Sequence, residues 1–144
     1  MMTIHVESII KVLVAVIIGG VIGFDRESIR RPAGLRTHIL VCVASAVVID
    51  MNIRLVENYI HADPVRLGAQ VISGMGFLGA GTIIKEGATV KGLTTAASLW
   101  AVACMGLVTG AGFYSLALFA TLVMVITLKF LNAFERRYHK KREK

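Results

Sequence analysis

The sequence has few charged residues and few residues that break or cross-link a chain. Of its 144 residues, 17% are Asp, Glu, Lys or Arg, and it contains only two prolines and two cysteines. Hydrophobic residues make up 56% and the mean hydropathy is +0.72, which is too apolar for an ordinary soluble domain. Cys42 and Cys104 lack a CxxC partner and a neighbouring metal ligand, so we interpret both as small buried hydrophobic residues.

Motifs of nucleotide-binding proteins and hydrolases are also missing. There is no Walker A sequence, no GxSxG and no HExxH, and the four histidines are scattered without ligand spacing. Gly74, Gly76 and Gly79 match the dinucleotide fingerprint by letter, but they lie inside an apolar stretch without a strand–helix–strand unit. We therefore predict that the protein is not an enzyme and holds no cofactor, and the sequence identifies no metal ligand.

Five apolar segments are long enough, with their flanking polar residues, to cross a bilayer, which takes about 20 residues. We predict an all-α integral membrane protein in which residues 1–131 form a five-helix transmembrane bundle and residues 132–144 form a short basic cytoplasmic tail. The predicted helices are residues 6–24, 37–53, 67–84, 93–108 and 113–128.

The basic residues fix the expected orientation. The net charge is +7, and the basic residues flank apolar segments, so we expect the lipid bilayer and not nucleic acid as the partner of this charge. With five crossings, thirteen lysines and arginines fall on one side and only Lys11, Arg54 and Arg66 on the other. The positive-inside rule then places the N-terminus outside and the C-terminus in the cytoplasm. Lys11 is expected to snorkel, and the first apolar run lacks the features of a removable signal peptide.

The third predicted helix is rich in glycine and carries no charge from Leu67 to Ile84. Small residues let membrane helices approach closely. We therefore expect Gly74–Gly81 to be a packing core that Thr94, Thr95 and Trp100 face. The uncharged polar residues of helices three and four either bond between helices or line a hydrated path. These residues are Gln70, Ser73, Thr82, Thr94, Thr95 and Ser98.

Helices one and four present small residues at helical spacing, including Ala15, Gly19 and Gly23 on the first. On the fourth they are Ala97, Ala101, Gly106 and Gly110. Two interpretations are open: these faces pack within one subunit, or they form the seam of a homodimer.

Asp25-Arg26-Glu27 follows the first helix directly, where the chain turns at Pro32 and Gly34. Together with the loop arginines it is either an ion-paired loop or an entrance that binds an ion, a phosphate or a partner. We expect Asp25 to accept hydrogen bonds from Arg36 or from main-chain donors. At the other face, Asp50 either pairs with Arg54 one turn on or contributes to an external cation site.

Four stretches resemble the MgtC/SapB family of bacterial inner-membrane proteins. They are GFDRE at 23–27, RPAGLRTHILV at 31–41, DPVRLGAQVISGMGFLGAGTI at 63–83 and VKGLTTAASLWAVACMG at 90–106. The resemblance implies a five-helix domain in the bacterial plasma membrane, with a link to growth at low magnesium and to intracellular survival of pathogens. It also implies a membrane transport or energy-converting partner, such as the ATP synthase.

The resemblance assigns functional residues by position. The acidic residue after the first helix falls on Asp25, the arginine before the second on Arg36, and two motifs fall on Ser73–Thr82 and Gly92–Trp100. The candidate functional residues are Asp25, Arg26, Glu27, Arg36, Thr37, Gln70, Ser73, Gly76, Gly79, Thr82, Thr94, Thr95 and Trp100. Many members carry a soluble C-terminal domain, which this sequence does not show, so we expect the activity to reside in the bundle or the tail.

Two functions are compatible with these features. The first is a non-enzymatic modulator of membrane transport machinery that acts in magnesium homeostasis. The second is a channel or transporter for Mg²⁺, another cation or a small solute. Intramembrane charges mark transport pathways, and the central layer of this sequence has almost none, which favours the modulator.

Overall fold

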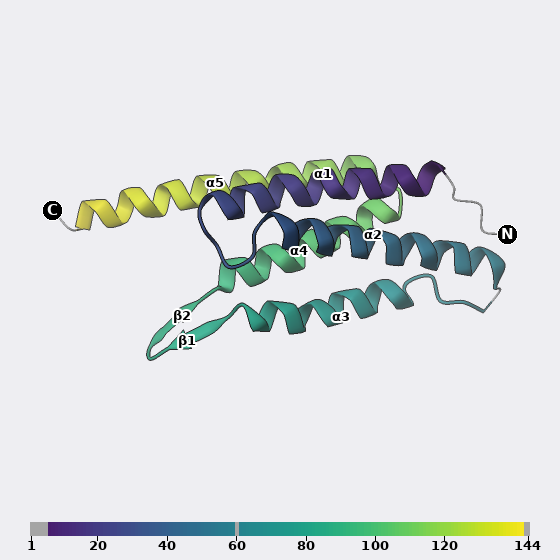
Figure 1. The fold of residues 1–144 in the computed structure, drawn as a ribbon, viewed down its shortest axis with the longest axis horizontal. Helices are drawn as coiled ribbons and strands as arrows, with labels where there is room; N and C mark the ends of the chain where they lie inside the picture. The colour runs from purple at the N-terminus through teal and green to yellow at the C-terminus, as the bar shows by residue number, and fades with distance from the viewer. Residues whose placement is uncertain (1–5, 60, 143–144) are drawn as a thin grey trace.

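The structure, a computed structural model, describes residues 6–59 and 61–142, with the backbone alone for residues 131–142. Within these residues the chain forms five helices and one two-stranded hairpin (Figure 1). The elements are α1 (Val6–Ser28), α2 (Leu35–Asn58), α3 (Arg66–Gly81), β1 (Ile84–Glu86), β2 (Thr89–Lys91), α4 (Leu93–Gly110) and α5 (Tyr114–Arg142).

Successive helices run in alternate directions between two ends of the molecule (Figure 1). One end holds the loop between α1 and α2, the β1–β2 hairpin and the end of α5, and we call it the loop end. The opposite end holds the start of α1 and the α2–α3 and α4–α5 connections. The start of α1 and the end of α5 therefore lie at opposite ends of the bundle.

The helices are apolar and of membrane length. Among the described residues, α1, α2 and α4 are each long and apolar enough to cross a membrane, and residues 114–130 of α5 form a shorter apolar helix. At 1.5 Å per residue the 16 residues of α3 rise about 24 Å, somewhat less than the ~30 Å of a hydrocarbon core. Large hydrophobic side chains cover the outside, Phe77 being 84% exposed and Phe24 69%. This is the surface of a multi-pass membrane protein.

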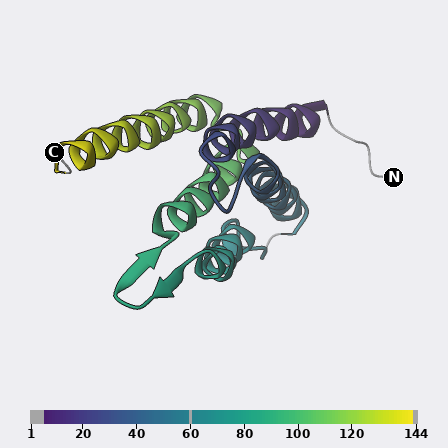
Figure 2. The same cartoon turned by 60° about the vertical axis from the view of Figure 1, so that its left-hand side comes forward.

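Three helices make the core. Helices α1, α2 and α4 pack on one another, while α3 and α5 lie on opposite sides of them (Figures 1 and 2). The buried hydrophobic residues come mainly from the three inner helices and include Ala15, Ile18, Ile22, Cys42, Ala46, Leu99, Val102 and Ala103.

Glycines allow the inner helices to touch through their backbones. A β-carbon added at Gly19 would lie 2.7 Å from the carbonyl oxygen of His38 and from the Cα of Ile39, both on α2. On α4, Gly106 and Gly110 meet α2 in the same way. The glycines of the predicted small-residue faces therefore pack within the chain, which agrees with the first interpretation, while Ala97 is exposed and Ala101 is half-buried.

The glycines of α3 do not form the predicted packing core. Nothing among the described residues lies within 4 Å of a β-carbon added at Gly74, Gly76 or Gly81, and within Gly74–Gly81 only Gly79 meets a neighbour, Ala96 of α4. The prediction is wrong because α3 turns its Gly68, Met75 and Gly79 side inward. The opposite side of α3, which carries most of its glycines, is exposed.

The connection from α3 to α4 departs from the predicted all-α fold. Helix α3 ends at Gly81 instead of 84, and the chain forms an antiparallel hairpin in which Ile84 pairs with Lys91. The base of the hairpin is tight because a β-carbon at Gly92 would collide with the Thr82 carbonyl, and Gly92 adopts a φ of 90°, which favours glycine.

The other helix bounds extend beyond the predicted ones. Helix α1 continues to Ser28, α2 runs from Leu35 to Asn58, and α4 reaches Gly110. Helix α5 continues to Arg142, so the backbone of most of the predicted tail is helical, while the side chains of that tail lie outside the described residues.

Candidate functional site

Buried polar side chains gather at the loop end, where α1, α2 and α4 meet. They are Asp25 and Arg26 from the last turns of α1, His38 from the first turns of α2 and Ser98 from α4. We call these four residues the loop-end cluster.

Arg26 is the most unusual member of the cluster. It is fully buried, and its Nε and one Nη donate to Oδ2 of Asp25 at 3.1 and 2.6 Å. The Asp25 side chain is itself only 11% exposed. The remaining nitrogen, Nη1, has no hydrogen-bond partner among the described residues. A buried N–H group without a partner is destabilising. An acceptor placed beside Nη1 would therefore stabilise Arg26.

His38 links α2 to α4. Its ring is fully buried, with Nδ1 at 2.9 Å from the Gly34 carbonyl oxygen and Nε2 at 3.1 Å from the Ser98 hydroxyl. A carbonyl only accepts, so Nδ1 carries a proton, and in the neutral ring Nε2 accepts from Ser98. The Ser98 hydroxyl also reaches the Thr95 carbonyl at 2.9 Å, which gives its single proton two alternative acceptors.

The loop beside the cluster holds a polar cavity of about 290 Å³. Glu27 forms one wall, and its Oε2 accepts a hydrogen bond of 2.7 Å from the Leu35 main-chain N–H at the start of α2. The cavity brings together Glu27, Arg36 and Thr37, three of the predicted site residues, with Arg31, Pro32, Gly34 and Leu35.

The predicted partner of Asp25 is wrong. The Asp25 carboxylate pairs with the adjacent Arg26, while Arg36 is exposed and forms no ion pair among the described residues. The main-chain donor expected for Asp25 is instead taken by Glu27. The reason is helical geometry: Arg26 points into the bundle, so its guanidinium needs the nearest carboxylate.

The predicted residues of helices three and four do not come together. On α3, Gln70, Ser73 and Gly76 are exposed. Thr82 donates to the carbonyl of Gly79, in its own helix, at 2.8 Å.

On α4, Thr95 is buried while Thr94 and Trp100 are exposed, Trp100 by 48%. Gly79 meets Ala96 of α4 and none of these three residues, and Trp100 lies one turn after Ala96 on the same side of α4.

A second polar cluster at the opposite end was partly missed from the sequence. Asp50 accepts from Arg54 at 3.2 Å, which confirms the predicted pair, but it also accepts from Lys11 and Ser8, each at 2.7 Å. Lys11 is only 5% exposed and does not snorkel. The sequence does contain a signal for this cluster, because Lys11 and Asp50 are opposite charges at similar depth in neighbouring apolar segments.

Both clusters are made of charges and hydroxyls that satisfy one another at the ends of the inner helices. Asp50 is surrounded by its own donors, which leaves it poorly placed for an external cation. No group of three or more His, Cys, Asp or Glu side chains within residues 6–59 and 61–130 is arranged to hold a metal ion. The polar cavity at the loop end is open to an outside molecule, whereas Arg26 Nη1 is buried and has no partner within the described residues.

Comparison with known proteins matches residues 12–137 to the model of the MgtC family. Protein SapB of Bacillus subtilis is 41% identical over 87% of this chain, and Protein MgtC of Brucella abortus is 47% identical over 77%. A protein of Escherichia coli named "Putative magnesium transporter YhiD" is 37% identical over 85% of this chain.

These relatives are longer than the chain. The matched regions cover 56% of SapB, 45% of the Brucella MgtC and 60% of YhiD, so the chain spans about half of their length. No solved structure matches this one.

Proposed function

Since the chain belongs to the MgtC family, we propose that it is a non-enzymatic protein of the bacterial plasma membrane that acts in magnesium homeostasis by modulating membrane transport machinery. The name of the E. coli relative refers to magnesium transport, which supports the link to this cation. The matched region is about half of each relative, so the proposal concerns the membrane domain that they share with this chain.

One observation favours a modulator over a transporter. The polar residues that were expected to line a path do not face a common lumen inside the bundle. Gln70 and Ser73 lie on the exposed side of α3. The buried hydroxyls of the bundle are engaged with main-chain carbonyls four residues back, as in Ser45 to Val41 and Thr109 to Met105. A conducting path needs polar groups that face a common lumen.

The same proposal includes the orientation. The alternating helices and the opposite positions of the start of α1 and the end of α5 fit five crossings (Figure 1). We infer that the loop end, with its exposed arginines, faces the cytoplasm, because basic residues are retained on that side. The polar cavity beside Glu27 and Arg36 would then be open to cytoplasmic anions or to an acidic partner.

A second candidate function, a channel, is favoured by one observation. The side chains of Gln70 and Ser73 are exposed on α3 without a hydrogen-bond partner among the described residues. In a membrane such groups need polar partners. If several chains assembled around their α3 helices, these side chains and the exposed glycines would line the contact, and a path could form there.

Flux separates the two functions. We would reconstitute the pure chain in liposomes and measure Mg²⁺ entry against empty vesicles, with Ser73→Ala and Thr82→Ala as variants. The modulator gives no flux above empty vesicles, while membrane vesicles from cells that produce the chain take up Mg²⁺ at an altered rate. Mg²⁺ flux from the pure chain that is lost in the variants would show that it is a transporter.

A further inference from the structure

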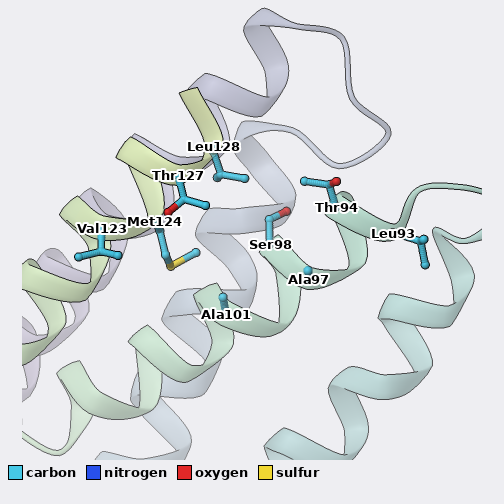
Figure 3. Close-up of a pocket in the computed structure, with 9 residues that line it drawn as sticks. All are labelled: Leu93, Thr94, Ala97, Ser98, Ala101, Val123, Met124, Thr127 and Leu128. Carbon is cyan, nitrogen blue, oxygen red and sulfur yellow. The ribbon is translucent and has the colours of Figure 1, made fainter. Parts of the chain in front are cut away.

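A groove between α4 and α5 has not been used by the function proposed above. It encloses about 460 Å³, within the size range of small-molecule sites. Figure 3 shows its residues on the facing sides of the two helices. The groove arises because α5 diverges from the inner bundle, as the view in Figure 2 shows.

The groove is lined mostly by apolar side chains, including Leu93 and Leu128 at the loop end, and three residues with hydroxyl groups lie among them. Thr94 and Thr127 lie toward the loop end, followed by Ser98, whose hydroxyl is held by His38 and Thr95 (Figure 3). Farther from the loop end the lining is Ala101 and Val123, which offer only carbon. An occupant that matches this lining has a long apolar part and a polar group at one end.

The volume discriminates between a lipid chain and a protein helix. A helix about 10 Å in diameter fills about 420 Å³ per turn of 5.4 Å, so the groove has room for about one turn. The groove is open to the outside along Ala97, Ala101 and Met124, so a single acyl chain can enter it side-on from the bilayer.

The positive charge at the loop end favours a lipid with an anionic head group. Five exposed basic residues there form no ion pair within the described part of the chain, in contrast to Lys91, which pairs with Glu86. They are Arg30, Arg31, Arg36, Lys85 and Lys129. Basic residues at a membrane surface attract anionic lipids by about 1 kcal/mol each.

We propose that the groove between α4 and α5 binds one acyl chain of an anionic phospholipid, with its phosphate at the loop end beside Thr94 and Thr127. The apolar lining holds the chain, the two threonine hydroxyls donate to the phosphate or ester oxygens, and the surrounding cations select the anionic head group. The groove residues are not used by the proposed function, but the head-group selection rests on it in part, because Arg31 and Arg36 also line the polar cavity described above.

The test is native mass spectrometry of the full chain, purified in mild detergent and mixed with equal amounts of phosphatidylglycerol and phosphatidylethanolamine. We expect one phosphatidylglycerol retained per chain, in preference to phosphatidylethanolamine. Ala101→Leu fills the groove and displaces about two methylenes, and each buried methylene changes affinity about fourfold, so retention falls about sixteenfold. Ala69→Leu is the matched control, because Ala69 lies outside this groove on the exposed side of α3.

A second pair of variants keeps the test decisive if Ala101→Leu fails to fold. Thr94→Val and Thr127→Val preserve size and remove the hydroxyls, and together they should reduce the retention of both lipids while the protein stays folded. Equal retention of both lipids by the native chain would overturn the proposal. So would unchanged retention in Ala101→Leu or in the double threonine variant, or a dimer that cross-links through Ala97→Cys within the groove.

Discussion

The Nζ of Lys11 lies 2.7 Å from Oδ1 of Asp50 and joins α1 to α2 at the end of the bundle opposite the loop. Both side chains are nearly inaccessible, with 6% and 12% of their surface exposed. Glu7, one turn before Lys11, and Arg54, one turn after Asp50, extend the pair on each side. Two charges that would each oppose burial in an apolar helix are therefore buried together.

The first prediction concerns this pair. Asp50→Asn should lower the free energy of unfolding by about 3–5 kcal/mol, because it leaves the Lys11 ammonium buried without its main partner. Chemical unfolding in detergent measures the change. Glu57→Gln on the exposed side of the same helix is the control, and the addition of Lys11→Met to Asp50→Asn should recover part of the loss. Unchanged stability in Asp50→Asn would show that the pair contributes little.

The second prediction concerns Asp25. Asp25→Asn should keep the fold, cost about 1.5–3 kcal/mol because it weakens two hydrogen bonds from the buried Arg26, and abolish activity. Growth of a strain that depends on this gene at low magnesium, together with the unfolding midpoint, measures both effects. Arg36→Gln, an exposed residue without an ion pair in the described part, should be nearly as stable as the native chain. Full activity of Asp25→Asn would show that Asp25 has only a structural role in the loop.

The third prediction separates folding from assembly. Gly19→Ala should destabilise the chain by about 1–3 kcal/mol, because the new β-carbon meets the α2 backbone. Gly20→Ala is the matched control on the neighbouring residue, where the nearest atom is 3.8 Å away and the substitution should be neutral or stabilising. Thermal unfolding of the monomer measures both. If Gly19→Ala weakened a dimer while leaving the monomer's stability intact, the packing would lie between chains.

The fourth prediction concerns the contact between α2 and α4. Ser98→Ala removes the hydroxyl that faces His38 Nε2 and should cost about 0.6–1.7 kcal/mol, the range measured for hydrogen bonds between membrane helices. Ser73→Ala on the exposed side of α3 should change stability by less. The ¹⁵N chemical shift of His38 should move in the first variant alone. An unmoved shift would mean that the ring and the hydroxyl are not bonded in the membrane.

The fifth prediction concerns orientation. Arg31→Cys at the loop end and Glu57→Cys at the opposite end should react with an impermeant maleimide from opposite faces of the membrane, the first from the cytoplasm. Intact and permeabilised cells give the comparison, with the native chain as the background control. Labelling of both positions from the same face contradicts an odd number of crossings between them.

The glycines show how far the sequence could predict this fold. Gly19 and Gly76 look alike as small residues in apolar helices, yet the first touches a neighbouring backbone and the second faces outward. In a soluble helix the polar face would have told the two apart, but a membrane helix is apolar on its outer side as well. The sequence signals close packing without saying which side of each helix packs.

The candidate site shows the same division. The sequence points to Asp25, Arg26 and Glu27 because they follow an apolar helix directly and are adjacent in the chain. The sequence does not predict the hydrogen bond between His38 and Ser98, because they are 60 residues apart and neither stands out within its helix. Lys11 and Asp50 were each noticed alone, and only the packing of α1 on α2 makes them a pair.

The sequence by itself determined the class of protein: its low charge, its apolar segments and its motifs specify a multi-pass membrane protein of the MgtC family. These properties depend on composition and order along the chain. The tertiary structure alone decided which polar groups meet, which glycines are covered and where α5 leaves a groove. Those features depend on the rotation and tilt of each helix, which only the simultaneous fit of side chains from several helices fixes.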